Sequence, residues 1–208
     1  MREVARFEPP ASEALREAVV RFDCVGRLLA DGSPDPGEAM VRDFLRGGGY
    51  EVAAEAGTGT TYMLGDREAA PGRLLGYVTL ALSQIKLTTG ERRGGEALGE
   101  VRQGDFGAIR VAMIGVDKEF GGQGHGKALL DAAVLHTARI NREVSVRFLI
   151  ADAVKTQVDW YKRQGFVENR AQAEVERLER IGERTGIAAV SMRLDLGPDP
   201  RSLLGEDE

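Results

Sequence analysis

The sequence predicts an α/β fold with a mixed sheet, formed as a single domain over residues 1–196. An apolar run at residues 109–116 leads through a glycine-rich segment into an amphipathic helix, and a second apolar run follows at residues 144–151. Such a strand–helix–strand unit forms a right-handed crossover between two parallel strands. The 208 residues, 42% of them hydrophobic, are also enough for one sizeable core.

The first third of the chain shows helical signals separated by loops. Ser12 can cap a first helix, and a second is expected over about residues 38–46, where three successive glycines end it. Residues 31–37 are rich in Pro and Gly and form the connecting loop. Residues 60–64 and 74–85 are rich in Leu, Val, Tyr and Thr, so we expect two strands that pair as neighbours.

The remaining elements follow from periodicity and from breaker residues. Polar residues 86–105 are expected to form a mobile surface loop. A helix over about residues 127–141 packs one face on the sheet, and two further helices are expected over about 155–164 and 169–184. Residues 187–194 form the last strand. The apolar face of the first of these helices consists of Leu129, Ala132, Ala133, His136 and Ile140.

Composition excludes several classes of protein. The formal net charge of −5 is too small for a disordered chain, and no apolar run approaches the ~18 residues of a membrane helix. Because no signal peptide is evident, we expect a cytoplasmic protein without a membrane partner. The single Cys24 cannot form an internal disulfide, and with only two histidines no structural metal site is expected. Residues 197–208 are expected to form a disordered acidic tail.

Residues 121–127 hold four glycines between a predicted strand and a helix N-terminus, where the first amides have no partner within the helix. Such glycines let amide groups approach a phosphate, and each hydrogen bond to a charged group contributes ~1.5–3 kcal/mol. The alternative is a flexible turn. Ala128 occupies the place where a P-loop needs Ser or Thr for magnesium, and Lys127 the place where a dinucleotide fingerprint needs glycine. Neither common nucleotide motif fits well.

This segment resembles the phosphate loop of the GNAT superfamily of N-acetyltransferases, whose Gln/Arg-x-x-Gly-x-Gly/Ala signature holds the pyrophosphate of acetyl-CoA. Gly121 occupies the Gln/Arg place, which removes one side-chain contact. A second block at residues 159–166 is similar to the family's aromatic-Tyr-x-x-x-Gly-Phe signature, although Val154 stands where the family often has Asn. The residues implied for the pyrophosphate are Gly121, Gly122, Gln123, Gly124, His125, Gly126 and Lys127.

The resemblance implies a mostly antiparallel mixed sheet with a splayed parallel strand pair flanked by helices. It also implies an enzyme that moves the acetyl group of acetyl-CoA to an amine by direct attack. Ile114, Gly115 and Val116 would pair with pantetheine as an added strand, and an N–H near Val116 would stabilise the oxyanion. Tyr161 is implied as the general acid for the departing thiolate. With pKa values of ~10 for Tyr and ~8.5 for a cysteine-like thiol, complete transfer is uphill by about 2 kcal/mol, which favours hydrogen bonding over complete transfer.

The general base is not identified by the sequence. Asp105, Asp117, Glu119 and His125 are near in sequence, but a carboxylate with a pKa near ~4 needs environmental tuning before it accepts an ammonium proton efficiently. We expect His125 to face solvent at the helix start and His136 to be packed on the apolar face. Water or a carbonyl group is the alternative proton acceptor.

The acceptor amine is also not identified. The N-terminal half resembles toxin acetyltransferases of toxin–antitoxin modules, which block the amine of aminoacyl-tRNA. The pI of about 5.3 disfavours nucleic acid as a partner, because phosphate binding relies on Lys and Arg. The segments that carry this resemblance are residues 22–24, 43–45, 60–64 and 75–80. The candidate phosphate-facing arginines are Arg92, Arg93, Arg139, Arg142 and Arg147, among interleaved acids.

Two other functions stay open from the sequence. One is a non-catalytic CoA-binding interaction protein, in which the charged helix from Asn169 onward seals against another subunit, as in a homodimer. That helix would otherwise cover an edge of the sheet. The other is a magnesium-dependent nucleotide hydrolase, which tight binding of Mg-ATP would reveal.

Overall fold

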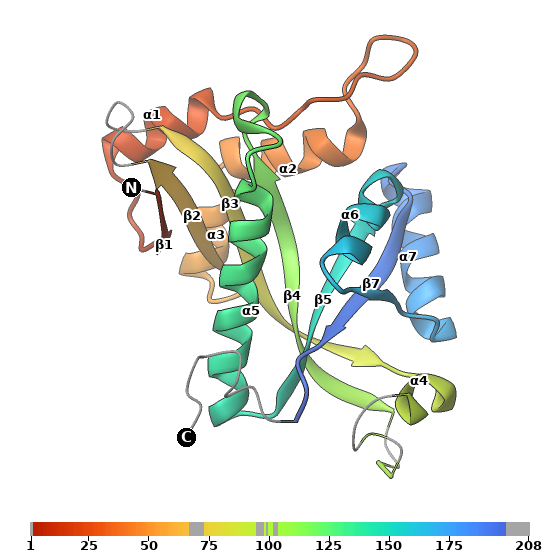
Figure 1. Ribbon diagram of the computed structural model, residues 1–208. Coiled ribbons are helices and arrows are strands. Elements are labelled where there is room, and N and C mark those ends of the chain that lie inside the picture. The colour runs from red at the N-terminus through yellow and green to blue at the C-terminus, as the bar shows by residue number, and fades with distance from the viewer. Residues whose placement is uncertain (1, 67–72, 95–97, 99, 102–103, 199–208) are drawn as a thin grey trace. The chain divides into compact units, whose positions relative to one another are not determined.

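The computed structural model describes residues 2–66, 73–94, 98, 100–101 and 104–198 (Figure 1). Its strands follow the order β1-β2-β3-β4-β5-β7-β6 in a mostly antiparallel sheet with one parallel pair, β4–β5. The chain forms two compact units, the first from residues 1–81 and 112–132 and the second from residues 82–111 and 133–208. The predicted α/β fold with a mixed sheet is therefore confirmed.

The first unit begins with short helices and antiparallel strands. Its elements up to the end of β3 are β1 (Arg2–Arg6), α1 (Glu13–Arg21), α2 (Pro36–Arg46), α3 (Gly49–Glu55), β2 (Thr60–Asp66) and β3 (Leu74–Lys86), which continues into the second unit. Ser12 caps α1 as predicted, since its side chain accepts a hydrogen bond from the N–H of Leu15. Asp35 caps α2 and Pro36 occupies its first turn, so this helix starts earlier than predicted.

The core of the first unit lies between α1, α2, α3 and the antiparallel strands. β2 pairs with β1 and with β3, which confirms the predicted pairing of neighbours. Tyr77 is fully buried at the centre, and its hydroxyl donates to the carbonyl oxygen of Val41 at 2.5 Å. The Tyr77 ring also meets Phe22 edge to face at 5.6 Å between centroids. This contact set holds α2 and the end of α1 against β3.

The rest of the chain supplies the crossover and the C-terminal elements. They are α4 (Thr89–Arg93), β4 (Asp105–Val116), the 3₁₀ turn η1 (Lys118–Phe120), α5 (His125–Glu143), β5 (Val146–Val154), the 3₁₀ turn η2 (Lys155–Gln157), α6 (Val158–Arg163), β6 (Val167–Glu168), α7 (Gln172–Thr185) and β7 (Ala189–Asp195). β4 and β5 are parallel over five residue pairs, from Gly107–Val146 to Val111–Ala151. The predicted strand–helix–strand crossover is confirmed.

The buried face of α5 differs in part from the predicted one. Leu129 and Ala133 are completely buried, as expected. Ile140, however, is 38% exposed, whereas Thr137 is completely buried. The Thr137 hydroxyl donates to the carbonyl oxygen of Ala133 at 2.8 Å, and this bond removes the cost of burying a hydroxyl. Apolar spacing alone therefore misplaced the later turns of this face.

The segment predicted as a surface loop contains a helix. Thr88 and Glu91 form a reciprocal capping box that starts α4, a pattern missed in the sequence analysis. Leu87 and Leu98 are buried beside this helix. Glu91 also pairs with Arg193 at 2.6 Å and accepts a hydrogen bond from the N–H of Arg170. The helix is thus attached to β7 and to the segment before α7.

Glu91 provides a testable contribution to stability. Burial by itself raises the pKa of Glu91, but hydrogen bonds from the N–H groups of Arg170 and Thr88 outweigh it and hold this pKa below its ordinary value. The stabilisation is therefore complete above about pH 4.3 and is lost as the pH falls through the lowered pKa. We expect Glu91→Gln to lower the free energy of unfolding by about 2 kcal/mol at pH 7. Urea unfolding at pH 7 and at low pH measures the difference, which should shrink on acidification; a constant difference contradicts the assignment.

The charged helix α7 packs within its own unit. Its sequence predicts a narrow apolar stripe of Ala171, Val175, Leu178 and Ile181. Ala171 and Leu178 are buried, whereas Val175 is 38% exposed. Glu174 is 7% exposed, and Arg177 pairs with it at 3.0 Å. The apolar stripe therefore packs, in part, against its own unit. A homodimer stays a prediction. The predicted disordered tail lies, from residue 199 onward, outside the described residues.

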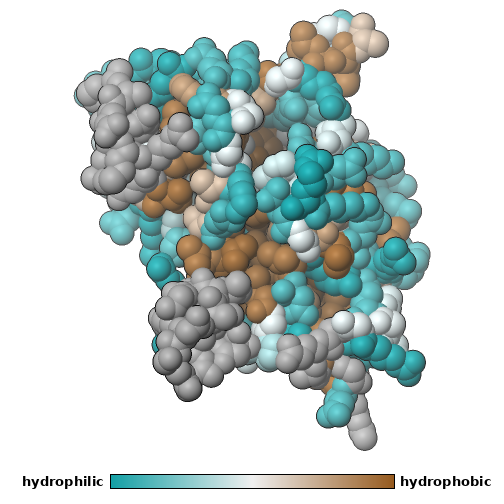
Figure 2. All heavy atoms as spheres, viewed as in Figure 1, coloured by the Kyte–Doolittle hydropathy of each residue, from teal (hydrophilic) through white to brown (hydrophobic). Residues whose placement is uncertain are grey.

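The surface is largely polar, with apolar side chains exposed at scattered positions. Figure 2 shows hydrophilic residues over much of one face, with hydrophobic atoms between them. Leu28 and Leu29, in the loop that Figure 1 shows projecting between α1 and α2, are 64% and 44% exposed. Within the part of the chain that the structure describes, no helix combines the length and apolar composition that crossing a membrane requires.

Candidate active site

The glycine-rich segment forms an open turn before α5. Gly122 and Gly124 adopt left-handed backbone conformations, with φ of +74° and +82°. A Cβ atom at either position would meet nothing within 4 Å, so the backbone is not covered there. A left-handed conformation favours glycine, and uncovered backbone is what close approach to a phosphate requires. The diphosphate site at this turn stays a prediction, with which both observations are compatible.

The two side chains that follow the turn differ from the sequence expectation. His125 is only 2% exposed, so the prediction that it faces solvent is wrong. Its ring meets Phe120 edge to face, with 6.3 Å between the ring centroids. Lys127 is exposed and its Nζ lies 2.6 Å from Asp131, one helical turn further on.

The end of β4 is packed too closely for side chains at two positions. A Cβ atom at Gly115 would lie 2.8 Å from Cγ1 of Val41. A Cβ atom at Gly76, on β3, would lie 2.7 Å from the carbonyl oxygen of Gly115 and 2.9 Å from Cδ1 of Leu129. Ile114 and Val116, on either side of Gly115, are half-buried. Gly76 was not predicted as part of the site, although a lone glycine inside a strand pattern often marks such a close approach.

Replacing Gly76 by alanine should disturb this part of the first unit. The carbonyl oxygen of Gly115 is backbone and cannot move aside as a flexible side chain would, so we expect a loss of about 1–3 kcal/mol in the free energy of unfolding. Gly65→Ala on β2 is the matched control, because its Cβ would lie 3.9 Å from the nearest atom. Thermal and urea unfolding of both variants measure the effect; equal losses for both would contradict the close approach.

The carboxylates considered as general bases already have partners. Asp117 is 7% exposed, and its two oxygens accept hydrogen bonds from the N–H groups of Asp23 and Glu119, each at 3.0 Å. Glu119 forms an ion pair with Arg73. Asp105 lies 3.9 Å from the Nζ of Lys86.

The nearby thiol of Cys24 is also an unsuitable nucleophile. Burial, together with the negative charges of Asp23 and Glu38, raises the pKa of this thiol to about 12. It therefore stays protonated at neutral pH.

Tyr161 belongs to the second unit and lies on α6. It is 5% exposed, and its ring meets Trp160 and Phe166 edge to face at 4.9 and 5.2 Å. Gly165, with φ of +87°, reverses the chain so that Phe166 packs on Tyr161. This reversal gives a structural reason for the Gly-Phe pair of the second signature. Burial, and secondarily the negative charge of Asp152, raises the pKa of Tyr161 above its ordinary value, so the phenol keeps its proton.

Asp152 belongs to a charged cluster in the second unit. Its carboxylate pairs with Arg110 at 2.5 Å and with Arg177 at 2.6 Å. These arginines come from β4 and α7, so the cluster joins two elements through one residue of β5. The cluster has no local sequence signal, because its members are distant along the chain.

Comparison with known proteins agrees with the motifs. Residues 72–168 match the family model of the acetyltransferase (GNAT) domain. Similar solved structures include a bacterial toxin, with TM-score 0.68 and 18% identity over 99% of this chain and 94% of that one. Another is AtaT in complex with acetyl-methionyl-tRNAfMet, with TM-score 0.68 and 16% identity over 94% and 95%. A third is AtaTR bound with acetyl-CoA, with TM-score 0.63 and 18% identity over 98% of each chain.

These structural likenesses show a shared fold, while the family match covers the strand, the glycine turn and the segment that carries Tyr161. Residues 72–168 are therefore similar to the acetyltransferase (GNAT) domain, and this match supports an acyltransferase whose acetyl donor is acetyl-CoA.

Proposed function

We propose that this protein transfers the acetyl group of acetyl-CoA to an amine by direct attack of the amine on the thioester. The observation that carries the proposal is the open glycine turn between β4 and α5, within the region matched by the family model. The open space beside Gly122 and Gly124 suits the diphosphate of the donor. Residues 121–127 would hold this group mainly through the backbone, since Gly121 offers no side chain.

The end of β4 would hold the pantetheine arm. Ile114, Gly115 and Val116 would pair with the arm as an added strand, and the Val116 N–H would donate to the oxyanion. The close packing of Gly115 on Val41 supports this role, because it restricts movement of the backbone that would make these hydrogen bonds. Restricted donors lose less free energy to reorganisation during reaction than mobile ones.

Tyr161 would donate a hydrogen bond to the sulfur as the thiolate leaves. Its raised pKa makes complete proton transfer less favourable than the ~2 kcal/mol expected for an ordinary tyrosine. Stabilisation of the developing charge by the O–H group is therefore the role that the chemistry supports. Tyrosine-to-phenylalanine mutants of AtaT and KacT are among the solved structures with this fold.

The proton of the attacking amine would go to water. The carboxylates near β4 and η1 are engaged with Lys86, Arg73 or backbone N–H groups, and none is positioned as an unengaged base. Because water takes the proton, turnover should rise with pH until the acceptor amine is deprotonated.

The experiment that tests this function combines binding and product analysis. Isothermal titration calorimetry with coenzyme A measures binding, and mass spectrometry after incubation with acetyl-CoA and a broad panel of amines detects acetylated products. We expect both binding and a product that requires acetyl-CoA. Binding without any product would favour the non-catalytic CoA-binding protein, and absence of binding would contradict both functions.

The second candidate narrows the acceptor to the α-amine of an aminoacyl-tRNA. It is favoured by the similarity to AtaT in complex with acetyl-methionyl-tRNAfMet, which extends over 94% of this chain. The charge distribution offers less support. Arg147 pairs with Asp195 at 2.6 Å, and Arg92 donates to the carbonyl oxygen of Val101 at 2.6 Å, so two of the candidate arginines already have partners.

Aminoacylated and uncharged tRNA distinguish this candidate. Acetylation of the charged tRNA alone, together with growth arrest on expression that Tyr161→Phe relieves, would support it. Absence of tRNA binding at low salt would count against it, because phosphate contacts are strongest there. A paired antitoxin, as in AtaTR, would be a partner to seek only after a positive result.

A further inference from the structure

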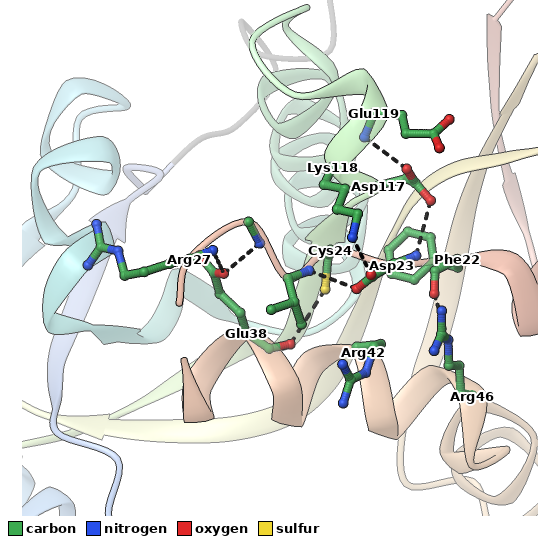
Figure 3. A network of polar contacts seen from close by, with 12 residues as sticks. Phe22, Asp23, Cys24, Arg27, Glu38, Arg42, Arg46, Asp117, Lys118 and Glu119 are labelled. Carbon is green, nitrogen blue, oxygen red and sulfur yellow. Dashed lines mark hydrogen bonds and ion pairs between the residues drawn. The ribbon is translucent and has the colours of Figure 1, made fainter. Parts of the chain in front are cut away.

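The connection between α1 and α2 is hydrogen-bonded to the turn after β4 through Asp23. The backbone carbonyl of Asp23 accepts from the N–H of Lys118 at 2.8 Å. Its side chain accepts from Nζ of the same lysine at 2.6 Å, and its own N–H donates to Asp117 at 3.0 Å. Figure 3 shows these groups facing one another. We call Asp23, Asp117 and Lys118 the Asp23 clamp.

Further hydrogen bonds within the same chain hold Asp23 and the residues next to it. Oδ1 of Asp23 accepts from the N–H of Val25 at 3.0 Å, and the carbonyl of Phe22 accepts from Nε of Arg46 at 2.7 Å. Glu38 accepts from two further N–H groups of the connection, those of residues 26 and 27, each at 2.8 Å. The connection therefore uses its polar groups to stay in one conformation (Figure 3).

Asp23 is charged at neutral pH, so its contact with Lys118 is an ion pair. Burial by itself raises the pKa of Asp23, but the hydrogen bonds from Lys118 and the N–H of Val25 outweigh it and keep this pKa below its ordinary value. The Asp23 side chain is 25% exposed and that of Lys118 is 50% exposed. An ion pair this exposed contributes little to the free energy of unfolding, so stability alone does not account for its role.

The clamp lies between the two backbone segments assigned to acetyl-CoA. Asp117 follows Val116 directly, and its N–H donates to the carbonyl of Leu75 on β3 at 2.9 Å. Lys118 begins η1, and its carbonyl accepts from the N–H of Gly121 at the start of the glycine turn. A displacement of Lys118 would therefore move both Val116 and Gly121.

We propose that Asp23 and Lys118 are positioning residues for acetyl-CoA, which hold the turn between Val116 and Gly121 so that the backbone groups on both sides can bind the donor together. The inference rests on the proposed function. The clamp supports donor affinity rather than the chemical step, because it contacts the backbone that binds and not the reacting atoms. Correct placement of such groups can change affinity or rate by one or more orders of magnitude.

The test uses the full chain with Lys118→Met, which keeps the aliphatic stem and removes the charge, and Asp23→Asn. Lys86→Met is the matched control, since Lys86 is 53% exposed and pairs with an aspartate in the second unit. We expect the Kd for coenzyme A and the KM for acetyl-CoA to rise about tenfold in both clamp variants, while kcat changes less than about twofold. The double variant should be no weaker than either single variant, because both remove one interaction.

Further measurements separate positioning from a structural role. Lys118→Arg keeps the ion pair and should retain the wild-type Kd, and urea unfolding should place Lys118→Met within about 1 kcal/mol of the control. Unchanged Kd values in the clamp variants, or a fall in kcat with KM intact, would overturn the proposal. If the wild-type protein acetylates an amine and the variants bind coenzyme A normally, only the proposed positioning role of the Asp23 clamp is contradicted. If the wild-type protein does not bind coenzyme A, the proposed function itself fails.

Discussion

Replacing Tyr161 by phenylalanine is expected to lower kcat by about 100-fold and to leave the KM for acetyl-CoA within about twofold. The phenylalanine ring can keep the edge-to-face contacts with Trp160 and Phe166, so the packing of α6 should persist. What is lost is the O–H donor to the departing sulfur. Steady-state kinetics with saturating amine, over a range of acetyl-CoA concentrations, measures both parameters.

The pH dependence offers a second check on Tyr161. Since burial raises the pKa of this phenol above its ordinary value of about 10, the O–H donor stays protonated throughout the neutral and mildly alkaline range. The kcat of the wild-type enzyme should therefore show no loss attributable to Tyr161 below about pH 10. Such a loss between pH 7 and 9 would be inconsistent with the buried phenol.

Tyr50→Phe is the matched control for this experiment. Tyr50 is a buried tyrosine of the first unit, 2% exposed, with its ring against Phe7. Removing the Tyr50 hydroxyl shows how the loss of a buried phenolic hydroxyl changes kcat at a position with no assigned catalytic role. If both variants lost the same kcat, or if Tyr161→Phe changed KM and kcat equally, Tyr161 would be a core residue rather than the proton donor.

Replacing Gly124 by valine is expected to weaken binding of coenzyme A by about 100-fold. At φ of +82° a β-branched side chain is strongly disfavoured, and a left-handed residue with a Cβ costs about 1–2 kcal/mol. The turn should relieve this strain by changing conformation, which moves the amides of the turn away from the diphosphate. Loss of two charge-assisted hydrogen bonds, at about 1.5 kcal/mol each, corresponds to the expected loss of affinity.

Gly186→Val separates backbone strain from ligand binding. Gly186 ends α7 with φ of +72°, and a Cβ there would also meet nothing within 4 Å. Both variants should therefore lose similar stability in urea unfolding, whereas only Gly124→Val should change the Kd measured by calorimetry. Equal Kd values for Gly124→Val and the wild type would mean that the glycine turn is only a turn.

Much of the secondary structure could be predicted from local pattern. The strands β2, β3, β4, β5 and β7 have dense apolar runs, and all were expected close to their observed positions. β1 was missed because Arg2–Arg6 has only two apolar residues, Val4 and Ala5, among three charged ones; β1 lies at the end of the strand order. The short helices α3 and α4 were missed because one or two turns carry too little periodicity.

In the candidate site, too, some features were predictable from local sequence and others were not. The positive φ angles at Gly122 and Gly124 follow from residue type, so their turn was predictable. The burial of His125 was not predictable, because it depends on packing against Phe120. The engagement of Asp117 by the N–H of Asp23 was equally hidden, and it removes a carboxylate that sequence proximity suggested as a base.

By itself, then, the sequence determined the order of strand, glycine turn, helix and strand, because periodicity and glycine conformation are local properties. It also contains the family signature that indicates acetyl-CoA as the donor. Only the tertiary structure decided the close approach of Gly76 to Gly115, the burial of Tyr161 near the charge of Asp152, and the pairing of Asp23 with Lys118 across 95 residues. These contacts join segments that are distant along the chain, and their free energy depends on which surfaces the fold brings together rather than on any neighbouring residue.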